Sequence, residues 1–260
     1  MNLSAQLRAL LGRKLNPAQI RAVKRLLYPL LYRGDLCKLA AGFGSDKYIG
    51  HHYAVHYQHH FAHLRHEHLT ILEIGIGGYG DPRAGGNSLK TWKAYFPNSR
   101  IFGIDICDKT FHDEPRIKTF QGSQADEAFL KRVIDEIGAP DIIIDDGSHL
   151  SHHVIATFKI LFPLLAPRGI YAVEDLQTSY WEHFAGEDWA GSKDLNAPHT
   201  SMNFFKVLVD GLNFDEFMIE GFSPGYFDRH IISMHFYHNL LFIYKGLNNE
   251  GSNMLGKRFS

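Results

Sequence analysis

Two short acidic clusters stand out in this sequence because each directly follows an apolar run. Residues 141–144 lead into Asp145-Asp146-Gly147-Ser148-His149, and residues 170–173 lead into Glu174-Asp175. If both runs are neighbouring strands of an open α/β sheet, the carboxylates meet where such sheets bind ligands. Converging carboxylates repel one another unless a cation or protons intervene, and all-oxygen sets favour Mg²⁺, with Mn²⁺ or Ca²⁺ as alternatives. The pattern indicates a divalent metal site, although Asp146 or Ser148 could merely cap the next helix.

His149 follows Asp146 by three residues, on the same predicted turn. An isolated histidine in a loop is more often a polar surface residue than a catalytic one. Beside a metal ligand, however, an imidazole is well placed to accept a proton near neutral pH. His149 is therefore the candidate general base, with His152 as the next candidate.

A glycine-rich turn, Glu73-Ile74-Gly75-Ile76-Gly77-Gly78, follows another apolar run. Such a turn lets backbone amides approach a nucleotide, and Pro82 delays the following helix, unlike in a dinucleotide fingerprint. Asp105 ends the next strand and can accept hydrogen bonds from both ribose hydroxyls. These residues predict an adenosine-containing ligand. Glu73 favours S-adenosylmethionine over a nicotinamide cofactor, because a carboxylate attracts the methionine ammonium and repels pyrophosphate.

The elements that must position these residues alternate between short apolar strands and helices. This alternation predicts a parallel sheet with both faces covered. In the tail, residues 230–245, two apolar runs flank His238-Asn239, which predicts an antiparallel hairpin at the end of the sheet. The predicted strands cover 69–75, 100–105, 116–121, 141–145 and 169–174, and the predicted helices cover 86–96, 125–137, 152–165 and 200–212.

Three further segments flank this pattern. Residues 3–33 predict a basic amphipathic helix, broken near Asn16-Pro17, that covers the core or a dimer partner, with a membrane surface or a lipid-linked substrate as the alternative. The histidine-rich segment 51–68 predicts a polar helix face, with a transition-metal site as the alternative, and its beginning at 44–53 could line the cofactor pocket. The polar loop 176–199, with Trp181 and Trp189, is expected to order over the acceptor or to pack on a partner subunit.

Composition excludes several classes of protein. The chain has 260 residues, is 45% hydrophobic and 21% charged, and carries a formal charge of −1, so it is globular and has no global electrostatic signal for nucleic acid. No apolar run is long enough for a transmembrane segment, and the N-terminus lacks a signal-peptide layout. Two cysteines cannot form a disulfide framework, so we expect a cytoplasmic protein.

With these residues in view, residues 44–246 resemble the metal-dependent sugar O-methyltransferases of the class I methyltransferase superfamily, which act on macrolide-linked sugars and mycobacterial methylmannose polysaccharides. D-D-G-S-H with V-E-D (173–175) is the specific element. The other matching pieces are G-S-D-K (44–47), H-H-Y (51–53), E-I-G-I-G-G (73–78), G-G-N-S-L (85–89), G-I-D (103–105), Q-G-S-Q-A-D (121–126), T-S-Y-W (178–181) and H-F-Y-H-N (235–239).

The resemblance implies a Rossmann-like class I methyltransferase sheet, mostly parallel with a C-terminal antiparallel hairpin and flanked by helices. An N-terminal helical arm or cap (1–66) would precede the methyltransferase domain (67–260). It also implies Mg²⁺-dependent transfer of a methyl group from S-adenosylmethionine to a sugar hydroxyl, in a protein that is a homo-oligomer, a dimer being favoured. Asp146, Glu174 and Asp175 would hold the metal, His149 would be the base, and Glu73, Gly75, Ser88, Asp105, Gln124 and Asp145 would lie at the cofactor.

Several alternatives stay open. Catechol O-methylation is the nearest, but that family ends its metal set in Asp-Asn, whereas Leu176 follows Glu174-Asp175 here. A related group is assigned to antibiotic hydroxylation, and a nicotinamide-dependent oxidoreductase or a catalytically silent binding protein would belong to other classes. The macrolide enzymes carry a long N-terminal domain that this sequence does not show, and its short helical arm is closer to the compact mannoside 1-O-methyltransferase type.

Overall fold

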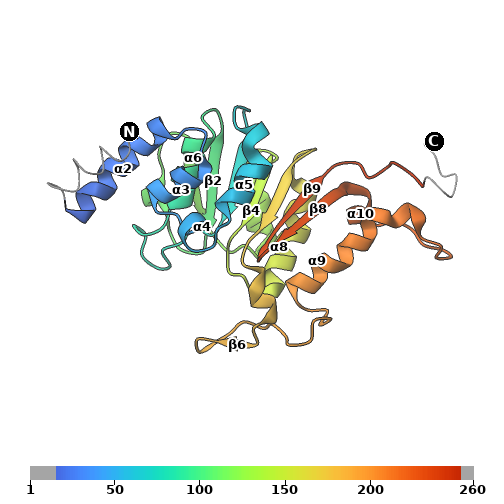
Figure 1. Ribbon diagram of the computed structural model, residues 1–260. Helices are drawn as coiled ribbons and strands as arrows, with labels where there is room; N and C mark the ends of the chain where they lie inside the picture. Colours follow the sequence, from blue (N-terminus) through green and yellow to red (C-terminus); the bar gives the residue numbers. More distant parts are fainter. Residues whose placement is uncertain (1–15, 253–260) are drawn as a thin grey trace.

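The computed structural model describes residues 16–252 and is built on a seven-stranded sheet in the order β3-β2-β1-β4-β5-β9-β8 (Figure 1). The first five strands of that order are parallel to one another, and β9 runs antiparallel to both β5 and β8. The strands are β1 (Thr70–Ile74), β2 (Arg100–Asp105), β3 (Ile117–Gln121), β4 (Ile142–Asp145), β5 (Ile170–Val173), β8 (Ile231–Tyr237) and β9 (Leu240–Lys245).

Helices cover both faces of this sheet and bury two apolar clusters. Side chains alternate along each strand, so Leu72 and Ile74 meet one layer of helices while Ile71 meets the other. The first layer contains α7 (Glu127–Ile137), α8 (Ser151–Leu164) and α9 (Ser201–Asp210), and the second contains α3 (Leu36–Phe43), α5 (Ala54–Phe61) and α6 (Asn87–Tyr95).

The predicted fold is confirmed element by element. Each of the five predicted parallel strands agrees with an observed one to within a residue at either end, and the four predicted helices agree to within two residues, which is the usual scatter of such boundaries. The predicted tail hairpin is also present, with Asn239 in the left-handed conformation at its turn (φ 60°). In this hairpin the later strand, β9, inserts beside β5 and leaves β8 at the edge of the sheet.

The N-terminal part begins with α2 (Pro17–Leu31), which projects away from the sheet in Figure 1. Asn16 caps this helix by accepting the amide of Gln19 at 2.9 Å, so a helix begins directly after the predicted break at Asn16-Pro17. The predicted helical residues 3–15 lie outside the described residues. No helix among residues 16–252 is both long and apolar enough to span a membrane.

The histidine-rich segment forms α5 and a short 3-10 turn, η1 (Ala62–Leu64). The prediction of a polar face is wrong for His60. This residue is 3% exposed and stacks on Phe242, with the two ring centroids 3.9 Å apart. Its Nδ1 and Nε2 lie 2.6 Å and 3.0 Å from the hydroxyls of Tyr244 and Tyr237. Burial lowers the pKa of His60 to about 4, so the ring stays neutral and belongs to the core.

The remaining elements are short. The loop after β5 contains a two-stranded ribbon that hangs below the sheet in Figure 1. These elements are α4 (Asp46–Ile49), η2 (Thr110–His112), η3 (Leu176–Tyr180), β6 (His183–Phe184), β7 (Glu187–Asp188), η4 (Gly211–Glu216) and α10 (Tyr226–His230).

Candidate active site

A cavity of about 880 Å³ opens at the carboxyl ends of the parallel strands, between the glycine-rich turn and the two acidic clusters. The start of the histidine-rich region, including Gly44, Asp46 and His51, also lines it, as the alternative interpretation of residues 44–53 predicts. Of the ten predicted site residues, Glu73, Asp145 and Glu174 are buried and do not line the cavity. The other seven do: Gly75, Ser88, Asp105, Gln124, Asp146, His149 and Asp175.

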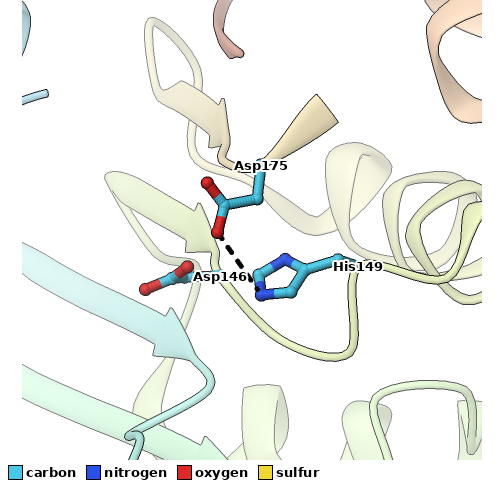
Figure 2. A group of neighbouring side chains, drawn as sticks. All are labelled: Asp146, His149 and Asp175. Atoms are coloured by element: carbon cyan, nitrogen blue, oxygen red, sulfur yellow. Dashed lines mark ion pairs between the residues drawn. The ribbon is translucent and has the colours of Figure 1, made fainter. Parts of the chain in front are cut away.

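Asp146, His149 and Asp175 converge on one point of this cavity (Figure 2). Asp146 and His149 follow β4 and Asp175 follows β5, which explains why residues far apart in the sequence meet here. One ligand atom of each lies within 4.8 Å of the others, and His149 Nε2 lies 3.7 Å from Asp175 Oδ2. Both His149 and Asp175 adopt left-handed backbone conformations (φ 58° and 55°), a strain that non-glycine residues keep mainly where function requires it.

Asp175 is held on its other side by the N-terminal helices. The Tyr53 hydroxyl donates to its Oδ1 at 2.7 Å, and His51 Nδ1 lies 3.2 Å from the same oxygen. Burial alone would raise the pKa of Asp175, but the hydrogen bond from His51, the charge of His149 and the Tyr53 hydroxyl together hold it below its ordinary value. Asp175 is therefore an ionised carboxylate at neutral pH, ready to meet a cation.

Glu174 points away from this cluster to the face of the sheet that α5 covers. Its Oε1 accepts from the Tyr57 hydroxyl at 2.6 Å and from the Lys47 ammonium at 2.7 Å. Lys47 also donates to Asp146 Oδ2 at 2.7 Å, so one buried cation contacts two of the three predicted metal ligands. Burial, and then the charge of Asp146, raise the pKa of Glu174 well above its ordinary value.

The cofactor side of the cavity is built on the glycine-rich turn and the end of β2. The two oxygens of Asp105 accept the backbone amides of Ile76 and Cys107, each at 2.9 Å, which fixes the carboxylate at the cavity wall. Beneath the turn, Ser88 Oγ donates to Glu73 Oε2 at 2.7 Å. The carboxylate of Glu73 is fully buried, and burial raises its pKa.

Asp145 and Gln124 belong to the opposite face of the sheet. Asp145 is 1% exposed and accepts from Gln124 Nε2 at 3.1 Å and from the Tyr171 hydroxyl at 3.3 Å. Gln124 also accepts the amide of Ser148 through Oε1 at 2.7 Å, so its amide group braces the turn that carries His149. Side chains alternate along β4, which sends Asp145 and Asp146 in opposite directions.

Two histidines, His152 and His153, follow His149 in the first turn of α8. His153 lines the cavity, with Nδ1 2.8 Å from Ser148 Oγ, whereas His152 is exposed and does not line it. The structure therefore makes His153, rather than His152, the neighbouring imidazole at the site.

A second cavity of about 510 Å³ lies beside the first, between η3 and the turn of the β8–β9 hairpin. Trp181 lines this second cavity and Trp189 lines the first, with their ring centroids 6.0 Å apart. The walls of the two cavities therefore meet at this pair of tryptophans. The remaining lining residues are Leu176, Gln177, Tyr180, Met202, Tyr237, His238 and Asn239.

The residues present fit a divalent cation and an adenosine-containing ligand. Asp146 and Asp175 converge and supply the carboxylate oxygens that Mg²⁺ or Mn²⁺ prefers, with the imidazole of His149 beside them. Next to these residues, the glycine turn makes room for a ligand: Gly77 adopts φ 75° and lines the same cavity as Asp105.

Comparison with known proteins gives the same picture. No family model matches the chain. Over 236 residues it is 46% identical to the 8-demethyl-8-alpha-L-rhamnosyl tetracenomycin-C 2'-O-methyltransferase of Streptomyces olivaceus, in an alignment that covers 90% of this chain and 61% of that protein. Over 219 residues it is 42% identical to the mycinamicin VI 2''-O-methyltransferase of Micromonospora griseorubida, covering 84% of this chain and 54% of that protein.

A solved structure of high similarity is MycE methyltransferase from the mycinamycin biosynthetic pathway, in complex with Mg, SAH and mycinamycin VI. It superposes with a TM-score of 0.79 at 41% identity, covering 86% of this chain and 57% of that one. The sheet and its flanking helices therefore have the class I methyltransferase fold. The chain spans between 54% and 61% of the length of the two relatives compared above.

Proposed function

Over the matched residues the chain belongs to the family of sugar O-methyltransferases, and we propose that it transfers a methyl group from S-adenosylmethionine to a sugar hydroxyl of a glycosylated natural product. The convergence of Asp146, His149 and Asp175 at one end of the cofactor-sized cavity carries this proposal. The relatives supply the acceptor class, because their names specify 2'-O-methylation of an alpha-L-rhamnosyl tetracenomycin-C and 2''-O-methylation of mycinamicin VI.

We assign the metal site to Asp146 and Asp175, with Glu174 buried behind them, and the base to His149. When bound, S-adenosylmethionine supplies a methyl group on a positively charged sulfur, and Mg²⁺ supplies positive charge beside the reacting oxygen. His149 accepts the proton of the hydroxyl, because its ring lies beside the proposed metal ligands, with Nε2 3.7 Å from Asp175 Oδ2. Asp175 in turn stabilises the imidazolium that forms.

The cofactor residues divide into those that touch the cavity and those that support it. We place the ribose at Asp105, whose carboxylate is already oriented by two backbone amides. Gly75 and Ser88 line the methionine end, and Glu73 lies beneath them as the negative charge that attracts the amino group. Gln124 touches the cavity and also braces the turn before His149, and Asp145 acts indirectly, through its hydrogen bond with Gln124.

We place the acceptor across the tryptophan pair. The reacting sugar would occupy the cavity beside His149, and the rest of the acceptor would extend past Trp189 and Trp181 into the second cavity. Aromatic faces pack well on sugar rings and on apolar aglycones, and the second cavity has Leu176 and Met202 in its wall. This arrangement keeps the prediction that the loop 176–199 closes over the acceptor.

Three further expectations remain proposals. A division at residue 66 into a helical cap and a methyltransferase domain is one. A homodimer is another, supported by the exposed leucines of α2 at positions 26, 30 and 31. A cytoplasmic location is the third, supported by the free thiols of Cys37 and Cys107, which fit a reducing compartment.

The direct test is a methyl-transfer assay with radiolabelled S-adenosylmethionine, Mg²⁺ and a panel of glycosides, aglycones and catechols. We expect label only in glycosides that carry free sugar hydroxyls. Calorimetry in parallel should show binding of S-adenosylhomocysteine and none of NAD. Label in catechols but in no glycoside, or binding of NAD with equal affinity, contradicts the proposal.

A further inference from the structure

Lys47 is an unusual cation, because three carboxylates from three different strands meet at its ammonium group. Its Nζ lies 2.7 Å from Asp146 Oδ2, 2.7 Å from Glu174 Oε1 and 3.3 Å from Glu73 Oε1. The side chain is only 3% exposed, so these contacts replace water almost completely. The acids follow or end β4, β5 and β1, whereas Lys47 comes from α4 in the N-terminal helices.

The other two lysines that are buried among the described residues do not share this arrangement. Lys109 donates to the backbone carbonyls of Tyr79, Asp81 and Ala84, and Lys245 donates to those of Pro163 and Leu165. Neutral carbonyls can hold a buried ammonium group for structural reasons alone. The three carboxylates around Lys47 carry more negative charge than a single ammonium group can balance. Buried ions are stabilising only when their charges are matched, so a structural role alone does not explain this set.

We propose that Lys47 is a resident cation of the active site that competes with the divalent metal for one oxygen of Asp146, while it holds Glu174 behind the metal site. The inference rests on the proposed function, since it takes Asp146 as a metal ligand. An oxygen that accepts from an ammonium is less available to a metal, and a positive charge at this distance repels a divalent ion. Lys47 therefore keeps the metal more weakly bound and more readily exchanged than the carboxylates alone would allow.

The same position links the metal site to the cofactor site. Glu73, proposed to attract the amino group of the cofactor, lies in the same carboxylate set as the metal ligands. When a metal takes Asp146, the ammonium of Lys47 keeps Glu174 and Glu73 as partners. The four negative charges of Glu73, Asp146, Glu174 and Asp175 are then balanced by Lys47, one divalent ion and one cofactor amino group. The negative charge of the site is therefore enough for one metal ion and not for two.

The test uses the full chain and Mn²⁺ alone, with no cofactor or acceptor, and measures free Mn²⁺ by electron paramagnetic resonance. Lys47→Met should lower the Kd for Mn²⁺ by at least about tenfold, because it removes a neighbouring positive charge and frees the ligand oxygen of Asp146. Lys47→Arg, which keeps the charge, should stay close to the wild-type Kd. Lys245→Met is the matched control for loss of a buried lysine and should leave the Kd unchanged.

A merely structural lysine gives the opposite sign, because disordered carboxylates bind metal less tightly. A folded Lys47→Met variant with an unchanged or higher Kd therefore overturns the inference. If Lys47→Met does not fold, Lys47→Met/Glu73→Gln removes one charge of each sign and is compared with Glu73→Gln. The double variant should bind Mn²⁺ at least about tenfold more tightly than the single one, and equal or weaker binding overturns the inference.

The outcome is separable from that of the proposed function. If Lys47→Met binds Mn²⁺ more tightly but the wild type methylates no glycoside, the inference about Lys47 is supported and the proposed function is wrong. If the wild type methylates glycosides but neither Lys47→Met nor Lys47→Met/Glu73→Gln binds Mn²⁺ more tightly than its reference protein, the inference about Lys47 is wrong and the proposed function stands.

Discussion

Gly75 packs directly against the backbone carbonyl of Asp146, so closely that a Cβ at Gly75 would lie 2.0 Å from that oxygen. The amide of Asp146 also donates to the carbonyl of Ile74 at 2.9 Å. The turn proposed to hold the cofactor and the turn proposed to hold the metal therefore support each other through their backbones. The glycine is required here by the neighbouring turn as much as by a ligand.

Gly75→Ala should weaken both sites at once. The new methyl group meets backbone that cannot move aside easily, and Gly75 also adopts φ 86°, so we expect a loss of about 2 kcal/mol or more in stability. Affinities for S-adenosylhomocysteine and Mn²⁺, measured by calorimetry, should both fall. Gly138→Ala is the control, because Gly138 has a similar φ of 82° but open space around its Cα; it should lose stability only. Full affinity for both ligands in folded Gly75→Ala would contradict the coupling.

His149→Ala should lower kcat by roughly 10²–10⁴, the range expected for loss of a general base. Binding of Mn²⁺ and S-adenosylhomocysteine should stay near the wild-type values, since Asp146 and Asp175 remain. His152→Ala should keep wild-type kcat because His152 is exposed and lies outside the cavity. If His149→Ala keeps its kcat, His153 becomes the candidate base, and His153→Ala decides the question.

Removal of divalent metal should abolish methyl transfer. After dialysis against EDTA the protein should be inactive, and added Mg²⁺ should restore activity. Asp175→Asn removes the carboxylate that His51 and Tyr53 hold ionised, and should raise the Kd for Mn²⁺ by at least about tenfold. Activity that survives EDTA unchanged would show that the acidic clusters are not a metal site.

Stability should depend on pH through Asp145. Burial raises its pKa from 3.8 to about 7, so between these values the unfolded chain releases a proton that the folded chain keeps. Stability therefore falls as pH rises from about 4 to about 7, by a few kcal/mol at about 1.4 kcal/mol per pKa unit, and this contribution is constant above pH 7. Asp145→Asn should flatten that slope in urea unfolding curves measured across the range. A wild-type slope that persists in Asp145→Asn would assign it to another group.

Trp181→Ala should raise the KM for the acceptor by about tenfold, the value of one aromatic contact, and leave the KM for S-adenosylmethionine unchanged. Phe111→Ala, an exposed aromatic residue outside both cavities, is the control. An unchanged acceptor KM in Trp181→Ala would place the acceptor elsewhere and leave the tryptophan pair as packing within the loop.

The sheet was predictable because its strands carry strong local signals. The run before Asp145 and the run before Glu174 are short and continuously apolar, as buried parallel strands are, and polar turn residues follow each of them. The convergence of the acidic clusters then follows from topology alone, since β4 and β5 are neighbours with parallel register. For this reason the grouping of Asp146, His149 and Asp175 could be predicted from the sequence.

Residues that act through long-range packing were not predictable in this way. Lysine is rarely buried, so Lys47 within a G-S-D-K motif gave no sign that three distant acids would surround it. The burial of His60 could not be predicted, because this histidine stacks on Phe242 of β9 whereas most histidines near it in the sequence are exposed. For Asp145 a usable signal existed: alternation along β4 places it on the face opposite to Asp146.

The contacts of Lys47 also have a consequence for the order in which the chain folds. Its partners Asp146 and Glu174 lie 99 and 127 residues further along the sequence. During synthesis the helix that carries Lys47 leaves the ribosome long before either acid exists, and contacts of such large sequence separation form late and slowly. Until β4 and β5 are in place, the ammonium of Lys47 keeps its water, and the N-terminal helices cannot close over it. We therefore expect the helices around Lys47 to be among the last elements to reach their final packing.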